Sequence, residues 1–210
     1  SGRVNVLGKD ITKEADYAKR NIGLVPQEYN LCQFIPIEET MINVAGYFGI
    51  DKKDAEKRTY TLFNQLGIWD KRKNTPRELS GGMKRRLMIA RALIHSPKIL
   101  ILDEPTAGVD TELRLTMWDF FQEINSQGVT IILTTHYLEE AEQLCRNIGI
   151  IDHGEIVVDT SMKDLLSRLD VQGFVLDLEK PLDQEPKIDG FELRLDDPLT
   201  LVTATNKEKS

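Results

Sequence analysis

Two adjacent carboxylates, Asp103 and Glu104, directly follow an apolar run at residues 99–102. A run that is apolar on both faces is typical of a buried parallel strand, and functional residues of open α/β sheets lie at the carboxyl ends of the strands. At such a place Asp103 could hold Mg²⁺ through water, while Glu104 takes a proton from an attacking water. The alternative is that the acidic pair only closes the strand, and the pair alone does not decide between the two.

Ser80, Gly81 and Gly82 precede the clearest helical pattern of the chain, an apolar stripe over residues 83–94. The unpaired N–H groups and the dipole at the start of a helix favour an anion, and the Ser80 hydroxyl adds a donor. The alternative is a plain N-cap by Ser80 with glycines in the turn, and the segment taken alone favours that interpretation.

Two more polar side chains come just after apolar runs. His136 follows residues 129–133, and Gln27 follows residues 22–25. A histidine there could donate to a phosphate oxygen or orient a nucleophile, and Gln27 could orient a water or ligate a metal ion. Taken alone, each would be an ordinary loop residue.

The elements that must position these side chains alternate between strand and helix, which predicts a parallel βαβ sheet covered by helices. We expect buried strands at 99–102 and 129–133, a further strand at 22–25 and an edge strand at 4–7. Helical segments are expected at 13–20, 38–66, 83–94, 113–125 and 138–145.

The last third of the chain has a different pattern. Residues 148–151 and 156–158 flank Asp152-His153-Gly154, which predicts a hairpin. Residues 174–178, 191–195 and 200–205 alternate apolar and polar side chains, which predicts antiparallel strands. We therefore expect a core formed by 1–33 and 78–160, a helical subdomain at 34–77, and the start of a β-rich accessory domain at 161–210.

Composition narrows the class of protein. The chain has 210 residues with 27 Lys plus Arg against 34 Asp plus Glu, a net charge of −7. Such acidity disfavours a nucleic-acid partner, and the dense apolar runs exclude a wholly disordered chain. The two cysteines, Cys32 and Cys145, form neither a zinc-ligand pattern nor a disulfide framework.

In their order and spacing these pieces resemble the ATPase subunit of an ABC transporter. The resemblance covers residues 1 to about 158 and rests on Gln27, Leu-Ser-Gly-Gly-Met at 79–83, Ile-Leu-Ile-Leu-Asp-Glu at 99–104, Ala-Gly-Val-Asp at 107–110, and His136. It implies an α/β P-loop NTPase (RecA-like) core with a helical insert. At position 83 the commoner residue in the family is Gln. The Met83 of this chain is similar to what subunits that serve bacterial exporters with a separate permease carry.

The resemblance also implies roles. ATP and Mg²⁺ are the implied cofactors, with Asp103 and Gln27 at Mg²⁺, Glu104 as the catalytic base, and His136 and Gln27 near the γ-phosphate. Two copies would pair head to tail, so that Ser80, Gly81 and Gly82 contact the ATP of the partner subunit and Asp110 couples the two sites.

A second implied partner is an integral membrane permease, which holds the export pathway. It would dock on the surface around Gln27 and residues 34–50, where Phe34, Tyr47 and Phe48 are more apolar than a solvated loop needs. The alternative for Met41, Ile42 and Val44 is packing inside the insert. The resemblance implies a cytoplasmic protein that lies at the inner face of the cell membrane. It implies no nucleic-acid partner.

One expected motif is missing. The phosphate loop G-x-x-x-x-G-K-[ST] is absent, and the nearest string, residues 2–10, has one residue too many between its glycines and Asp10 where Ser or Thr is needed. We expect a fragment that lacks this loop and its strand, binds ATP very weakly and does not hydrolyse it. Loss of that strand is expected to expose apolar faces of 22–25, 99–102 and 129–133 and to weaken the monomer.

Two alternatives remain. A soluble ABC ATPase of DNA repair or translation would share these motifs, but such proteins usually carry coiled coils, zinc modules or a second cassette. A non-enzymatic module that has lost its phosphate loop would also fit, although Asp103, Glu104 and His136 are all retained.

Overall fold

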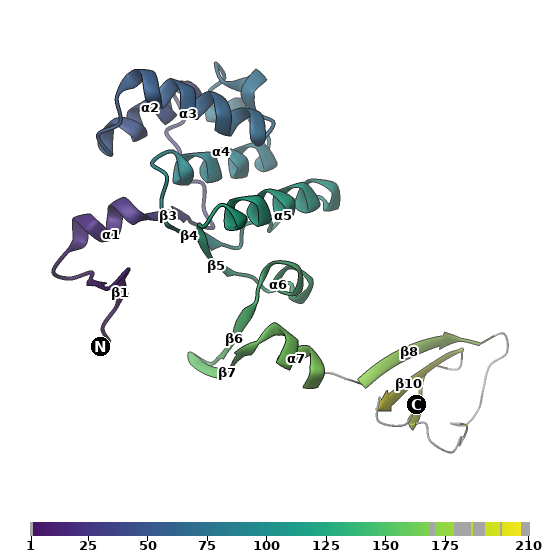
Figure 1. Cartoon of the computed structure of the whole chain (residues 1–210). Coiled ribbons are helices and arrows are strands. Elements are labelled where there is room, and N and C mark those ends of the chain that lie inside the picture. The colour runs from purple at the N-terminus through teal and green to yellow at the C-terminus, as the bar shows by residue number, and fades with distance from the viewer. Residues whose placement is uncertain (1, 169–170, 179–185, 187–191, 198, 207–210) are drawn as a thin grey trace. The chain divides into compact units, whose positions relative to one another are not determined.

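The computed structural model describes residues 2–168, 171–178, 186, 192–197 and 199–206 (Figure 1). The chain forms two compact units, Ser1–Leu144 and Cys145–Ser210. All of the candidate site residues belong to the first unit.

The centre of the first unit is a parallel sheet of β3 (Ile22–Val25), β4 (Ile99–Asp103) and β5 (Thr130–Thr134), in the order β3-β4-β5. Leu102 pairs with Val25 on one side and with Leu133 on the other, so the three strands end almost level. The predicted strands and their parallel pairing are confirmed. Parallel strands that end level bring their following residues to one edge of the sheet.

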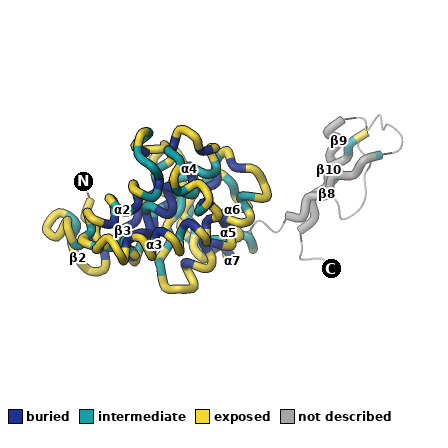
Figure 2. The backbone as a smooth tube through the Cα atoms, turned by 90° about the horizontal axis from the view of Figure 1, so that it is seen from above, coloured by how far each residue is buried: buried dark blue, intermediate teal, exposed yellow. Residues whose placement is uncertain are grey.

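Helices α4 (Gly81–Leu93) and α5 (Thr111–Ser126) pack on this sheet, and α2 (Ile37–Tyr47) and α3 (Lys52–Gln65) pack against α4 and each other. The buried positions gather among these helices and β3 (Figure 2). Gly23 fits because β3 lies directly on α4: a Cβ there would come within 2.4 Å of the Ala92 carbonyl oxygen. Leu87, Met88, Leu100 and Leu102 are fully buried in this core.

The predicted strand at 129–133 is present as β5, but the prediction that it is buried is wrong. Alternate residues of β5 are exposed, and Ile132 keeps 52% of its surface accessible. Among the described strands, β5 has a hydrogen-bonded neighbour only in β4, so it is an edge strand. Leu24 of β3, also an edge strand, is 55% exposed, whereas Val25 is fully buried. The expected apolar exposure is therefore present on the face of β3 and β5 that carries Leu24 and Ile132, and the opposite face is more buried.

Turns shorten two predicted elements. The expected strand at 4–7 is reduced to β1 (Asn5–Val6), because Leu7 and Gly8 adopt positive φ and turn the chain into β2 (Lys9–Asp10). The expected helical region 38–66 is two helices, since Gly49 at φ 78° ends the first and Asp51 caps the second through Asp54 N–H. The remaining elements of this unit are α1 (Ala15–Asn21), α6 (Leu138–Leu144) and the 3₁₀ turns η1 (Trp69–Lys71) and η2 (Pro76–Glu78).

The second unit begins with the predicted hairpin. Its strands are β6 (Asn147–Asp152) and β7 (Glu155–Ser161), joined by His153 and Gly154 with positive φ. Strands β8 (Val171–Asp177), β10 (Thr200–Asn206) and β9 (Glu192–Asp197) follow as an antiparallel sheet in that spatial order. Phe191 of the expected strand 191–195 lies outside the described residues. Helix α7 (Met162–Arg168) was not predicted, although Ser161 accepts from Asp164 N–H as an N-cap does.

Across the described residues, no helix combines the length and the apolar character that crossing a bilayer requires.

Candidate active site

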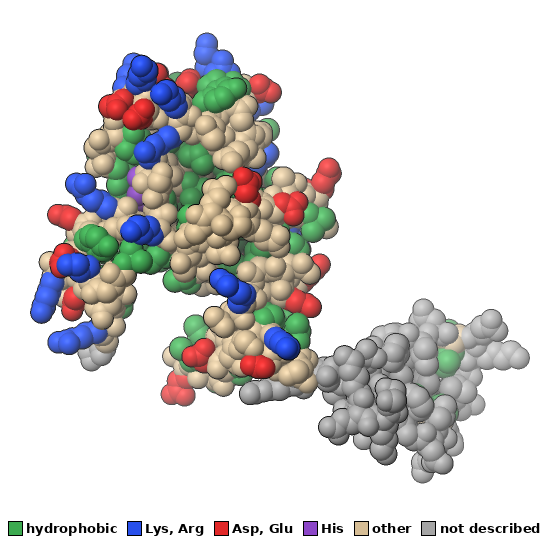
Figure 3. All heavy atoms as spheres, viewed as in Figure 1, with side chains coloured by type: hydrophobic (Ala, Val, Ile, Leu, Met, Phe, Trp, Pro, Cys, Tyr) green, Lys and Arg blue, Asp and Glu red, His purple; other side chains and the backbone are tan. Residues whose placement is uncertain are grey.

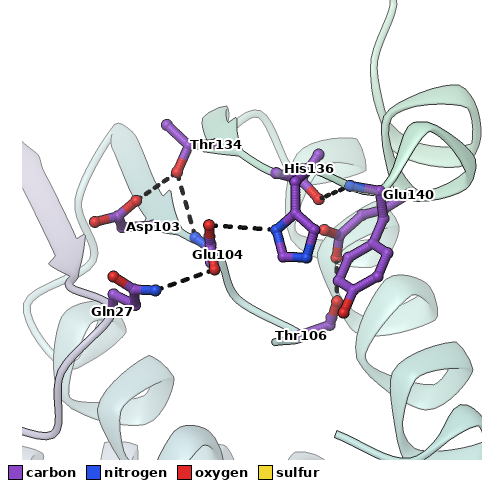
Figure 4. Close-up of polar contacts among 9 residues, drawn as sticks. Gln27, Asp103, Glu104, Thr106, Thr134, His136 and Glu140 are labelled. Carbon is purple, nitrogen blue, oxygen red and sulfur yellow. Dashed lines mark hydrogen bonds and ion pairs between the residues drawn. The ribbon is translucent and has the colours of Figure 1, made fainter. Parts of the chain in front are cut away.

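Three predicted site residues meet at the carboxyl edge of the parallel sheet. Gln27 Nε2 donates to Glu104 Oε2 at 3.1 Å, and His136 Nδ1 lies 3.3 Å from Glu104 Oε1 (Figure 4). They come from three separate places: Gln27 two residues beyond β3, Glu104 directly after β4, and His136 two residues beyond β5. The Glu104 carboxylate is thus held on both sides, with an amide on one oxygen and an imidazole on the other.

The backbone at Glu104 is strained. Its φ of 45° is in the left-handed region, which costs a non-glycine residue about 1–3 kcal/mol. Contacts around the turn hold this conformation: the Glu104 N–H donates to the Thr134 carbonyl at 3.1 Å, and Ala107 N–H donates to the Glu104 carbonyl at 3.2 Å. The turn leads the side chain off the strand direction and toward Gln27 and His136. Strain that surrounding contacts maintain in this way is typical of functional sites.

Asp103 is the last residue of β4, and it accepts a hydrogen bond from the Thr134 hydroxyl. Thr134 therefore supports both carboxylates, because its main chain fixes Glu104 and its side chain fixes Asp103. The sequence analysis missed this residue, since a threonine at the end of a strand carries no signal of its own.

The oxygens of Asp103 and Gln27 are ligands that suit Mg²⁺. The described part of the chain holds no cluster of three or more His, Cys, Asp or Glu that could form a metal site by itself. Mg²⁺ usually keeps several waters and takes only one or two carboxylates together with substrate phosphates. One strand-end carboxylate beside an amide oxygen therefore fits that ion better than it fits a metal held by protein ligands alone.

A buried arginine holds the segment that carries Gln27. Arg85 of α4 is 3% exposed and donates to the carbonyls of Pro26 at 2.9 Å and Gln27 at 3.0 Å. A second hydrogen bond runs from this segment to α4, because the Tyr29 hydroxyl donates to the Gly81 carbonyl at 3.1 Å. The sequence analysis missed Arg85 because an arginine in an amphipathic helix usually faces water. The Gln27 segment and the start of α4 are consequently joined by hydrogen bonds in both directions.

Ser80, Gly81 and Gly82 lie at the start of α4. Ser80 is exposed, and its hydroxyl accepts from Met83 N–H at 3.3 Å, so the predicted N-cap is confirmed. A Cβ on Gly82 would come within 2.6 Å of Leu113 in α5, which gives that glycine a packing reason. Within the described chain, no hydrogen bond joins these three residues to Glu104 or His136.

Asp110 lies at the exposed N-terminus of α5 and accepts from Leu113 N–H at 2.9 Å. Burial lowers the pKa of the Arg86 guanidinium, and the charge of Asp110 acts in the opposite direction. The starts of α4 and α5 thus lie together, and both present capped, polar ends to solvent.

Known proteins resemble this chain in sequence and in fold. A family model described as ABC transporter matches residues 1–107. The linearmycin resistance ATP-binding protein of Bacillus subtilis is 40% identical over 169 residues, which are 80% of this chain and 54% of that protein. The Nod factor export ATP-binding protein I of Rhizobium etli is 37% identical over the same shares of each chain. The chain thus spans about half the length of these relatives.

Solved structures agree with the predicted α/β core. An ATP-binding subunit of an ABC transporter superposes with a TM-score of 0.72 at 24% identity, covering 80% of this chain and 70% of the other. The protein cbiO1 of Clostridium perfringens, part of the ABC transporter complex cbiONQ, superposes with a TM-score of 0.70 at 26% identity, covering 80% and 69%. Together with the order of the site residues along three parallel strands, these matches show that the chain belongs to the ABC transporter family, as part of its ATP-binding subunit.

Proposed function

We propose that the protein containing this chain hydrolyses ATP and thereby drives export through a separate membrane permease. The observation that carries the proposal is the Glu104 carboxylate, held between Gln27 and His136 at the end of β4. A carboxylate with one oxygen toward an amide and the other toward an imidazole is suited to accept a proton from a water placed between these groups.

Each side chain then has a separate task at the γ-phosphate. Glu104 receives the proton of the attacking water, Gln27 orients that water through its amide, and His136 donates a hydrogen bond to a phosphate oxygen. Asp103 and the side-chain amide oxygen of Gln27 would hold Mg²⁺, which when bound would neutralise charge on the phosphates. The hydrogen bond from Thr134 keeps Asp103 oriented for this.

The second part of the proposal is a head-to-tail homodimer. Ser80, Gly81 and Gly82 would then bind the ATP of the partner subunit, and Asp110 would couple the two sites. Support comes from the start of α4, where Ser80 and Gly81 are exposed next to the free N–H groups of the helix. A solved relative with this fold is described as a dimeric ATP-binding cassette bound to ADP and Pi.

The third part is permease docking on residues 34–50 and the Gln27 segment. Phe34 is 72% exposed and Tyr47 is 87% exposed, although the Arg77 guanidinium lies 4.2 Å from the Phe34 ring centre. Met41 is fully buried, so it packs the insert as the alternative interpretation has it.

A cavity lined in part by Val44 of α2 and by Phe48 at the end of that helix adjoins this surface. Its volume is about 650 Å³, and its lining includes Leu24, Val44 and Phe48. Apolar side chains lie on the surface between α1 and α2 on the face that Figure 3 shows. An apolar helix of a permease at the cytoplasmic face of the membrane would fit such a surface, and one relative is named for export.

The test is an ATPase assay on the full gene product reconstituted with its permease in lipid vesicles. Glu104→Gln keeps the size of the side chain but replaces one acceptor oxygen with an NH2 group and removes the base, so turnover should fall by about 10²–10⁴-fold. Tyr60→Phe, an exposed change on α3, is the matched control and should leave turnover unchanged. A wild-type protein without ATPase activity, or a Glu104→Gln variant with normal turnover, would contradict the proposal.

A further inference from the structure

Glu140 is a buried carboxylate to which the proposed mechanism gives no task. It lies in α6 and is 1% exposed. Its Oε1 accepts two hydrogen bonds, from the Thr106 hydroxyl at 2.8 Å and from the Trp118 indole N–H at 3.0 Å. Its Oε2 is buried and has no hydrogen-bond partner among the described residues. Both donors are themselves buried, so the whole contact is removed from solvent.

This single oxygen joins three segments of the first unit. Thr106 belongs to the loop 105–110, which leaves Glu104 and ends at Asp110. Trp118 lies in the middle of α5, and Glu140 lies one turn beyond His136 (Figure 4). The loop's own support is two turn hydrogen bonds, from Ala107 N–H to Glu104 and from Val109 N–H to Thr106. Glu140 is therefore the side chain that ties this loop to the segment carrying the histidine.

Stability alone does not account for a carboxylate at this place. Burying a carboxylate is costly, and in the part of the chain that is described no Lys, Arg or His forms an ion pair with Glu140. If the neighbouring side chains needed no hydrogen-bond acceptor, an apolar side chain of similar size would fill the same space without the cost of burying a charge. The acceptor is needed because Thr106 and Trp118 both point their donors at it.

We propose that Glu140 is a positioning residue that fixes the loop 105–110 against α6, and so keeps Glu104, Asp110 and His136 in their relative places. Its effect on turnover rests on the proposed ATPase function. The placement of the loop does not, because the contacts that fix it are all made between residues of this chain.

Two substitutions separate positioning from a general contribution to stability. Thr106→Val and Trp118→Phe each remove one donor to the same oxygen of Glu140, and the second also opens a larger space in the core. If Glu140 only stabilises the fold, Trp118→Phe has the larger effect on every measurement. If Glu140 positions the loop, Thr106→Val affects the loop and Trp118→Phe does not. Glu140→Gln keeps an acceptor for both donors, whereas Glu140→Leu removes it.

The first measurement is amide hydrogen exchange of the 210-residue chain without nucleotide. We expect Thr106→Val and Glu140→Leu to speed exchange at Ala107 and Val109 by about tenfold, while exchange in β4 changes little. Trp118→Phe and Glu140→Gln should leave the loop as in the wild type. The inference would be overturned if the amides of Ala107 and Val109 exchanged equally fast in Thr106→Val and Trp118→Phe. It would also be overturned if their exchange rates simply followed the melting temperatures of the variants.

The second measurement is ATP turnover of the full gene product. Thr106→Val and Glu140→Leu should lower kcat by about tenfold or more with KM for ATP nearly unchanged, because misplaced groups act on the transition state. Glu140→Gln should restore kcat to near the wild-type value. If the wild type itself does not hydrolyse ATP, the proposed function fails and the exchange data still decide the positioning. If the wild type is active and Thr106→Val keeps its kcat, the positioning role fails.

Discussion

Replacing Arg85 with Met should detach the Gln27 segment from α4. The change keeps the unbranched stem of the side chain and removes the guanidinium, which is 3% exposed and donates to the Pro26 and Gln27 carbonyls at 2.9 and 3.0 Å. Both carbonyls then lose a charged donor. The contacts with α4 that remain are the Tyr29 hydroxyl on the Gly81 carbonyl and Arg91 on the Asn30 carbonyl.

The size of the effect follows from two opposing contributions. A hydrogen bond from a charged group contributes about 1.5–3 kcal/mol, so the two bonds together contribute about 3–6 kcal/mol. Against this, Arg85 Nε is buried without a partner among the described residues, and removing it relieves a desolvation cost of about 1–3 kcal/mol. The midpoints of these two ranges differ by about 2–3 kcal/mol, and we expect the free energy of unfolding to fall by that amount, a large part of the about 5–15 kcal/mol of an ordinary domain.

The assay is urea denaturation followed by tryptophan fluorescence. Trp69 and Trp118, the two tryptophans of the chain, both belong to the first unit, so the signal reports the unfolding of the part that contains Arg85. Lys84→Met, on the preceding residue of α4, removes a positive charge without touching the Gln27 segment and serves as the control. A loss below about 0.5 kcal/mol for Arg85→Met, or an equal loss for Lys84→Met, would refute the reasoning.

Three further predictions concern stability and binding. Gly23→Ala should destabilise the chain by about 2–3 kcal/mol, because the new Cβ meets the Ala92 carbonyl oxygen at 2.4 Å. Gly46→Ala, with open space around it, should be neutral or stabilising. Urea denaturation compares the two variants, and similar losses of stability would contradict the packing argument. Burial lowers the pKa of His95, so the unfolded chain takes up its proton first, and the free energy of unfolding should fall as the pH drops below about 6.5. Urea denaturation at about pH 7.5 and about pH 5.5 should show a smaller fall in His95→Gln than in the wild type, and an equal fall would exclude His95 as the cause. The 210-residue chain should bind MgATP very weakly, because its sequence holds no G-x-x-x-x-G-K-[ST] loop to supply the lysine and the backbone cradle for the phosphates; a micromolar affinity by calorimetry would contradict this.

The strands and the polar side chains at their ends could be predicted from sequence. The run at 99–102 is apolar at every position, and Asp103 and Glu104 interrupt it abruptly, so both the strand and the acidic pair at its end stand out. Because parallel strands end at one edge, Gln27 and His136 could be expected near Glu104, and the structure brings all three within hydrogen-bond distance.

What supports those residues could not be predicted. Arg85 and Glu140 are charged residues on amphipathic helices, a pattern that usually means contact with water, yet both are buried. Their partners are backbone carbonyls and side chains many residues away, and only the packing of α4, α5 and α6 brings them together. Exposure of an apolar face on these strands was expected, but an apolar pattern does not tell which face another element covers, and in β5 the open face is the one that carries Ile132.

The central claim is that Glu104 is the base for ATP hydrolysis at a head-to-tail dimer interface. The most direct measurement is the molar mass of the Glu104→Gln full gene product by light scattering, with MgATP and with MgADP. The account predicts a stable dimer with MgATP and a monomer with MgADP, because binding is retained while hydrolysis is blocked. A mass that does not respond to MgATP would contradict it.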